Sequence, residues 1–314
     1  MLKDLDPNTI SAGQYKGLPL LDVVKPIILR NNRWRCDHGW DVDLDDGSSN
    51  YIITNNLALN GGIKLREGFG RTMENNIMVN NSFHPHVWYQ GSGDTVRNNI
   101  VFTAYKPIRV PKPWGEAVDL NLLHVPGLAV PRPAAGLQAQ SGRDLQSMEA
   151  DAGFINPQAG DYRVRPDSPA LKLGFRNFPM DQFGVQWPKL KALARTPDLP
   201  SPLASAPTTG SQRDGKPTVW LGATVKNIVG MGEVSASGLP AETGVIVLGI
   251  LPASRANAAG LRVGDVILKL DGQTIGSLVD LQRASAGSPS FGTVKLTIWR
   301  GQRDTILDAE APVR

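Results

Sequence analysis

The chain has 314 residues and a formal net charge of +4, with 41% hydrophobic and 20% charged residues. This length fits about two domains, and no apolar run approaches the ~20 residues that span a bilayer. Lysine and arginine are scattered and form no basic stripe interleaved with aromatic residues, so a nucleic-acid partner is not expected. Cys36 is the only cysteine, which excludes an intrachain disulfide and a cysteine-based zinc site.

The first part of the chain carries a repeat built on an asparagine pair. Each pair follows a short stretch with strand-like composition, and the second asparagine recurs every 20 to 24 residues. A period in this range with short alternating strands is typical of a solenoid. The repeats are ILRNNRW (28–34), IITNNLA (52–58), TMENNIM (72–78), TVRNNIV (95–101) and, with a single asparagine, VDLNLLH (118–124).

We predict an all-β, right-handed parallel β-helix over residues 1–193, because the repeats lack the leucine consensus and the helix of a leucine-rich repeat. Its rungs would stack about 4.8 Å apart. A solenoid needs capped ends. Segment 151–175 is expected to close the C-terminal end, whereas upstream rungs are expected to be missing at the N-terminal end, which would leave an edge for oligomer contacts. The asparagines expected to form a hydrogen-bonded ladder along the axis are Asn32, Asn56, Asn76, Asn99 and Asn121.

A linker and a small α+β domain are predicted after the solenoid. Residues 194–215 are rich in Pro, Ser, Ala and Thr and lack periodicity, which predicts a semi-extended linker. The α+β pattern covers residues 216–314. Its expected elements are strands at 218–225 and 244–251, a short helix at 254–260, a turn and strand at 261–275, an amphipathic helix at 277–287, and a hairpin at 293–310 around Arg300–Gly301.

The string SRANAAGLRVGDVILKLDGQTIGSLVDLQ resembles bacterial PDZ domains of the HtrA type, and the likeness covers roughly residues 216–312. In that family a Leu-Gly loop binds a peptide C-terminal carboxylate, and the peptide adds as a strand beside the second helix. The alternative is a module that only packs against its neighbour. The peptide-binding residues that the resemblance implies are Trp220, Leu221, Gly222 and Ala223 in the loop, and Leu278 and Leu281 on the helix.

A protease is disfavoured because no Ser/His/Asp set accompanies the PDZ-like region. All of the histidines lie in the solenoid half of the chain. They are His38, His84, His86 and His124.

Three consecutive rungs carry polar loops, WDVDLDDG (40–47), GIKLREG (62–68) and HPHVWYQG (84–91). Alternation places Val42 and Leu44 inside the first rung, so the residues between them face outward. Carboxylates, cations, histidines and aromatic rings then gather on one face, which suits a sugar. The residues expected to bind substrate there are His38, Trp40, Asp41, Asp46, Lys64, Arg66, His84, His86 and either Trp88 or Tyr89, with Asp43, Asp45 and Glu67 as candidate catalytic residues.

Adjacent rungs also predict a separation between carboxyl groups. An aspartate of the first loop and Glu67 of the next would have backbones about 5 Å apart, near the ~5–5.5 Å typical of retaining glycosidases. One carboxylate would attack the anomeric carbon, and the other, with a raised pKa, would protonate the leaving oxygen.

The aspartates alternate as in an EF-hand loop, but an EF-hand is rejected because Gly47 comes one position late and Ile52 stands where a bidentate glutamate is needed. Two other interpretations of the aspartates stay open. A different Ca²⁺ site on a β-helix, as in pectate lyases, is one alternative; otherwise no metal or cofactor is expected. The other alternative is a solvated acidic turn.

The stretches HGWDVDLDDGSSNYIITNNLALNGGIKLREGF and NNSFHPHVWYQGSGD resemble the β-helix glycoside hydrolases typified by family 120 β-xylosidases, and the likeness covers roughly residues 26–190. The resemblance implies a retaining enzyme with an Asp nucleophile and a Glu acid/base. The matching positions are Asp45, with Asp43 next, and Glu67. It implies a xylan-derived oligo- or polysaccharide as substrate. We expect a secreted or periplasmic bacterial protein, although MLKDLDPNTISAGQ is no signal peptide as written. A Ca²⁺-dependent polysaccharide lyase and a non-catalytic glycan-binding scaffold are the alternatives.

Overall fold

The computed structural model describes Gly17, Leu20 and residues 23–193, 214–287 and 292–310. The chain separates into two compact units, Met1–Ser205 and Ala206–Arg314. Most of the predicted linker, residues 194–213, lies outside the described residues. Among the helices of the described residues, none is long and apolar enough to cross a membrane.

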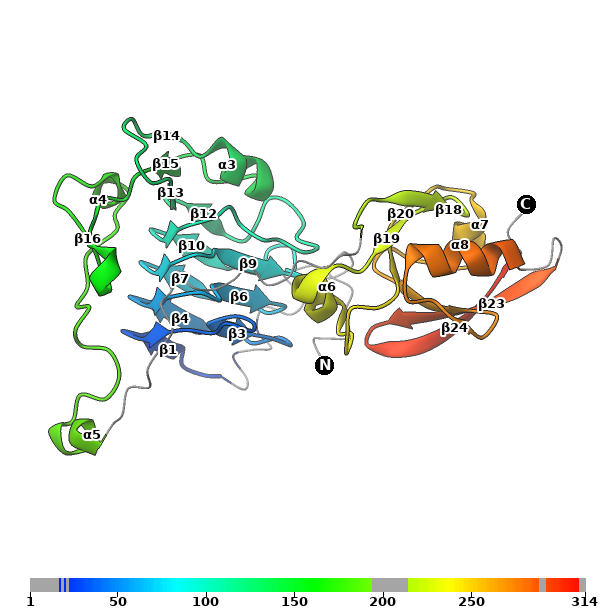
Figure 1. The fold of residues 1–314 in the computed structure, drawn as a ribbon, viewed down its shortest axis with the longest axis horizontal. Coiled ribbons are helices and arrows are strands. Elements are labelled where there is room, and N and C mark those ends of the chain that lie inside the picture. Colours follow the sequence, from blue (N-terminus) through cyan, green and yellow to red (C-terminus); the bar gives the residue numbers. More distant parts are fainter. Residues whose placement is uncertain (1–16, 18–19, 21–22, 194–213, 288–291, 311–314) are drawn as a thin grey trace. The chain divides into compact units, whose positions relative to one another are not determined.

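The first unit is a parallel β-helix, as predicted, with short strands stacked into three sheets (Figure 1). The first sheet has the order β1 (Ile27–Arg30), β4 (Tyr51–Thr54), β7 (Thr72–Glu74), β10 (Thr95–Arg97) and β12 (Ala117–Asp119). The second has the order β2 (Arg33–Trp34), β5 (Leu57–Ala58), β8 (Ile77–Met78), β11 (Ile100–Val101), β13 (Leu122–His124) and β15 (Met148–Ala150), with β14 (Arg132–Pro133) antiparallel at its end. The third consists of β3 (Val42–Leu44), β6 (Ile63–Arg66) and β9 (Phe83–His86).

The asparagine pairs have two separate structural roles. The first member of each pair adopts a left-handed conformation, with φ between 55° and 58° at Asn31, Asn55, Asn75 and Asn98. Asparagine tolerates this conformation better than most residues. The second member forms the predicted ladder, because each backbone N–H and side-chain amide donates to the Oδ1 of the next asparagine at 2.9–3.1 Å from Asn32 to Asn121. The ladder prediction is confirmed.

Replacing Asn76 in the middle of this ladder is expected to destabilise the solenoid. Asn76→Ala removes the acceptor of the Asn56 backbone N–H, which is 3.0 Å from Asn76 Oδ1 and buried. An orphaned buried group and its lost partners cost about 1–3 kcal/mol, which urea unfolding would measure. The matched control is Asn32→Ala at the half-exposed end of the ladder, where the side-chain amide bonds to Asn56 Oδ1 and to the exposed Arg30 carbonyl are lost and no buried backbone group loses its acceptor. Equal losses in the two variants would contradict a role for ladder burial.

The C-terminal end of the solenoid is closed by a segment that sequence analysis did not identify. Helix α3 (Ala135–Ser141) places Leu137, together with Ala134, in the interior cluster beside Trp114. The predicted cap, residues 151–175, was wrongly placed. It forms β16 (Phe154–Asn156), a 3₁₀ turn (Pro157–Ala159), β17 (Asp161–Val164) and α4 (Pro169–Lys172), with α5 (Pro188–Leu193) further along the chain.

This segment runs down the side of the stack and covers the outer face of the second sheet (Figure 1). Phe154, Tyr162 and Leu173 pack there in one cluster with the first residues of the second-sheet strands. Those sheet residues are fully buried, so the segment shields apolar surface that a plain solenoid would expose to water. They are Leu57, Ile77, Ile100 and Leu122.

In the described residues of the second unit, one antiparallel sheet packs with three helices. The sheet has the order β18 (Thr218–Trp220), β19 (Ala223–Asn227), β20 (Val245–Ile250), β21 (Val266–Leu270), β23 (Thr293–Arg300) and β24 (Arg303–Glu310), with β22 (Gln273–Thr274) on β21. The helices are α6 (Gly230–Ser237), α7 (Arg255–Ala258) and α8 (Leu278–Gly287). The expected strand at 244–251, the expected helices at 254–260 and 277–287 and the C-terminal hairpin are confirmed. The expected strand at 218–225 is wrong, because a turn at Leu221–Gly222 divides it into β18 and β19, and α6 was not predicted.

Candidate functional site

The third sheet aligns the polar side chains of the three predicted loops in columns. Asp43, Lys64 and His84 are direct neighbours across β3, β6 and β9. Two residues further along the strands, Arg66 is the neighbour of His86. Val42, Leu44, Ile63 and Leu65 point into the core, as alternation predicted.

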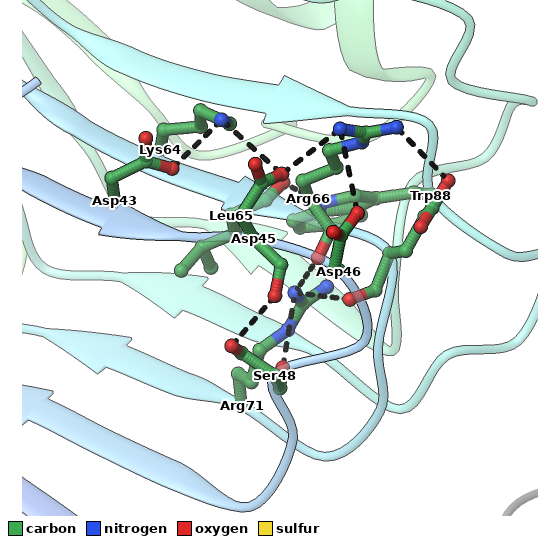
Figure 2. Close-up of polar contacts among 10 residues, drawn as sticks. Asp43, Asp45, Asp46, Ser48, Lys64, Leu65, Arg66, Arg71 and Trp88 are labelled. Atoms are coloured by element: carbon green, nitrogen blue, oxygen red, sulfur yellow. Dashed lines mark hydrogen bonds and ion pairs between the residues drawn. The ribbon is translucent and has the colours of Figure 1, made fainter. Parts of the chain in front are cut away.

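Lys64 and Arg66 form ion pairs with aspartates of the first loop (Figure 2). Lys64 Nζ lies 2.7 Å from Asp43 Oδ1 and 3.3 Å from Asp45 Oδ1. Arg66 Nη1 lies 3.1 Å from Asp45 Oδ1 and 3.6 Å from Asp46 Oδ1. The aspartate side chains are 40–50% exposed, whereas Lys64 is fully buried and Arg66 nearly so. The outer face is therefore acidic, with the cations beneath it.

Glu67 is buried on the other side of the Arg66 guanidinium. Its Oε1 lies 3.6 Å from Arg66 Nη2, and the residue is only 4% exposed. Burial is the largest effect on its carboxyl group and raises the pKa of Glu67 to about 7, against the opposing influence of Arg66. Its Oε2 and the Nε of Arg66 are buried atoms without a hydrogen-bond partner. Buried polar atoms usually have a partner, so this unsatisfied pair sets the Arg66–Glu67 group apart from most of the solenoid interior.

A histidine pair and Trp40 border this group. The Trp40 ring lies 4.2 Å from Lys64 Nζ and meets His84 and His86 edge-on, at centroid distances of 6.0 and 5.5 Å. Both ring nitrogens of His86 are buried without a partner. Burial, reinforced by Lys64 and Arg66, lowers the pKa of His86 to about 3, so its imidazole is neutral.

A buried ion pair fixes the turn that carries Glu67. Arg71 and Asp94 are both fully buried, with Nε–Oδ1 and Nη2–Oδ2 distances of 3.0 and 2.6 Å. Arg71 Nη1 also donates to the backbone carbonyls of Arg66, Glu67 and Ser48 (Figure 2). This residue therefore positions the Arg66–Glu67 backbone, and its role was missed because a basic residue after a turn carries no such signal in the sequence.

Asp41 and both of the aromatic alternatives, Trp88 and Tyr89, lie away from the outer face. Trp88 is in the solenoid core, 1% exposed, and its Nε1 donates to the Leu65 carbonyl at 2.7 Å. Tyr89, the other aromatic residue considered, is buried against Phe69. Asp41 uses both carboxylate oxygens to accept four backbone N–H groups, among them Gly61 and Gly62, so it organises the turn between rungs. His38 is exposed on the loop before Trp40.

Among the residues that the structure describes, no group of three or more His, Cys, Asp or Glu side chains is arranged to hold a metal ion. Asp43, Asp45 and Asp46 find their partners in Lys64 and Arg66.

The second unit has a pocket of about 630 Å³ beside the β18–β19 turn. Of the residues expected to bind peptide, Trp220, Leu221 and Gly222 line this pocket. Ala223 and Leu281 are buried in the core, and Leu278 is half-buried against that core. Sequence analysis did not identify its other lining residues. These are Val219, Ala253, Ser254, Arg255, Gln282 and Ser285.

Comparisons with known proteins match the second unit. A family model described as PDZ domain matches residues 219–310, and the second unit is therefore a PDZ domain. The chain is 40% identical over 62 residues to the magnetosome formation protease MamE of Magnetospirillum gryphiswaldense, and 35% identical over 79 residues to a probable periplasmic serine endoprotease DegP-like of Marinomonas sp.. These matches cover 20% and 24% of this chain, and the chain spans only 8% and 16% of the two relatives.

Solved structures give matches of similar extent. One is the HtrA-type protease AlgW with a decapeptide, at a TM-score of 0.27 and 27% identity, over 30% of this chain and 29% of that one. Another is the HtrA3 PDZ domain bound to a phage-derived ligand, at a TM-score of 0.25 and 21% identity, over 30% of this chain and 86% of that one.

Proposed function

We propose that the outer face of the third sheet hydrolyses a glycosidic bond. The observation that carries the proposal is that one guanidinium, that of Arg66, contacts both the half-exposed Asp45 and the buried Glu67, whose pKa is raised to about 7. A glycosidase needs this asymmetry between two carboxyl groups, one ionised at the anomeric carbon and one that keeps its proton near neutral pH.

Asp45 is the nucleophile in this scheme and Glu67 the acid/base. Asp45 attacks the anomeric carbon, the glycosidic C–O bond breaks, and Glu67 transfers its proton to the leaving oxygen. Glu67 then deprotonates a water, which releases the sugar from Asp45. Asp45 is preferred to Asp43 because Asp43 pairs with Lys64 in the neighbouring column and makes no ion pair with Arg66 among the contacts of the described residues. The substrate class is a xylan-derived oligo- or polysaccharide.

Two xylosides with different leaving groups test these roles. Asp45→Asn should lower kcat/KM at least 100-fold on both p-nitrophenyl β-xyloside and xylobiose. Glu67→Gln should reduce kcat/KM on xylobiose by a similar factor but spare kcat/KM on the nitrophenyl substrate, because nitrophenolate leaves without a proton. Its kcat on the nitrophenyl substrate should still fall, because no base activates the water of the second step. Asp43→Asn is the matched control. Unchanged rates in both of the first two variants would refute the assignment. Unsaturated products formed only with Ca²⁺ would indicate a lyase, and glycan binding without turnover a scaffold.

A second function is favoured by the PDZ match and the pocket at residues 219–222. We propose that the second unit binds the C-terminus of a peptide or protein, and that the protein acts outside the cytoplasm, in the periplasm or as a secreted protein. Arg255 also lines the pocket and adds a positive charge there, while its Nε lies 3.4 Å from Glu310 Oε2.

A further inference from the structure

The backbone edge at which a PDZ ligand would add as a strand is already paired. Strand β19 has two edges, and β20 pairs with one of them. The other edge pairs with β18 of the same chain, in the register Thr218–Val225, Val219–Thr224 and Trp220–Ala223. Each backbone group can serve one neighbouring strand at a time, so an added strand and β18 exclude each other on β19.

The segment before β19 also follows the flank of helix α8. At one end, Asn227 Nδ2 donates to the Asp214 carbonyl, and Asn227 Oδ1 accepts from the Leu278 N–H at the start of α8. At the other end, Trp220 Nε1 donates to Ser285 Oγ in the last turns of α8 at 2.9 Å. Residues 214–220 therefore run antiparallel to β19 and in the same direction as α8, which is the path of a bound peptide strand in this kind of recognition.

Trp220 anchors this segment. Its ring is 8% exposed and belongs to the core cluster with Leu281 and Ala284 of α8, whereas Val219 is 68% exposed. The turn that follows is closed by Leu221 at φ 50° and Gly222 at φ 83°. A left-handed leucine costs about 1–2 kcal/mol, and this position of a two-residue turn favours asparagine or glycine. The hairpin is thus firmly anchored at Trp220 but closed by an unfavourable turn.

We propose that Thr218–Trp220 is an internal ligand of the PDZ domain, and that an external partner binds by displacing it. The partner that fits is an extended peptide whose C-terminal residue is a large aromatic, preceded by β-branched residues. Its ring takes the place of Trp220 against Ser285, and its main chain takes the place of β18. This inference rests on the proposed peptide-binding function and adds to it both the ligand class and the step that controls access.

The tethered segment competes at a high effective concentration, of the order of millimolar for so short a connection. External peptide therefore binds the closed form weakly. Weakening β18 raises the affinity, and locking it abolishes binding.

The test uses the full chain and the fluorescein-labelled peptide DGKPTVW, the sequence of residues 214–220, with a free C-terminus. Thr218→Pro is the opening variant. Trp220 and Ala223 flank the two-residue turn and form a hydrogen-bonded pair, and such pairs alternate along the hairpin, so Thr218 and Val225 form the next hydrogen-bonded pair. Proline at position 218 removes the N–H that donates to β19, while every residue of β19 and α8 stays unchanged. Fluorescence anisotropy should give a Kd at least 10-fold lower for Thr218→Pro than for the unmodified chain. The peptide ending in Ala should bind Thr218→Pro at least 10-fold more weakly.

A disulfide lock is the matched closing variant. Val219 and Thr224 face each other as a non-hydrogen-bonded pair, whose Cα separation of about 4.5 Å suits a disulfide. Val219→Cys with Thr224→Cys, in a Cys36→Ser background, should bind the peptide when reduced and not when oxidised.

Equal affinities of the unmodified chain and Thr218→Pro, or equal affinities of the oxidised and reduced lock, would overturn the proposal. If the oxidised lock binds the peptide as tightly as the reduced lock, the displacement of β18 is refuted but the peptide-binding function is not. If hydrogen exchange of Thr218→Pro shows β18 open and no peptide binds, both the displacement and the peptide-binding function are refuted.

Discussion

Glu67→Gln should make the first unit more stable than the unmodified protein above pH 7, by about 3 kcal/mol. In the native state burial raises the pKa of Glu67 from 4.5 to about 7, and each pH unit of such a difference is worth about 1.4 kcal/mol. The sign follows from proton binding. The folded form holds this proton more tightly than the unfolded form, so stability is full below pH 4.5 and declines as the pH rises to about 7. Glutamine is neutral throughout and escapes this loss.

Urea unfolding of the two proteins at pH 4.5, 6, 7 and 8.5 would measure the effect. The difference in free energy of unfolding should grow from pH 4.5 to 7 and then level off. A constant difference across this range would mean that Glu67 ionises in the folded protein as it does in water.

Breaking the Arg71–Asp94 pair should be the most destabilising single change in the solenoid. Arg71→Met leaves the Asp94 carboxylate buried without its guanidinium and removes the donor to the Arg66, Glu67 and Ser48 carbonyls. Loss of one partner of a buried ion pair costs about 3–5 kcal/mol. In thermal unfolding, the Tm of Arg71→Met should therefore be roughly 10 °C below that of the unmodified protein, for a unit of this size.

A double variant separates the buried charge from the lost packing. Arg71→Met with Asp94→Leu removes both charges and should recover a large part of the loss, because no unpaired carboxylate remains. If the double variant is as unstable as Arg71→Met, the carbonyl contacts of Arg71 rather than its ion pair hold the turn together.

The solenoid could be predicted from sequence because its determinants are local and repeated. The ladder asparagines recur once per turn, and the alternation around Val42 and Leu44 correctly identified which side chains point inward. The C-terminal cap has no such period. Helix α3 closes the end with Leu137 through tertiary packing alone, whereas the more apolar segment after it covers a side face instead.

The candidate site and the PDZ edge were only partly predictable for different reasons. The columns of the third sheet follow from register, but the surroundings of Glu67 also include chain distant in sequence. The Ile108 backbone pairs with His86, and the charge of Arg109 lowers the pKa of the Glu67 carboxyl group. The β18–β19 turn goes against local preference. Leucine at a left-handed position gives no turn signal, so Thr218–Val225 looks like one continuous strand.

The uneven spacing of the asparagine ladder has a consequence for modifying the solenoid. Successive ladder residues are separated by 20 to 24 positions, yet every ladder bond is 2.9–3.1 Å long. Chain length and axial rise are therefore uncoupled, because the extra residues bulge sideways from a rung without lifting the next one. Loops between rungs can therefore be lengthened, shortened or exchanged while the strands that hold Asp45 and Arg66 keep their alignment. The solenoid is in this sense a scaffold whose loops can be replaced one at a time.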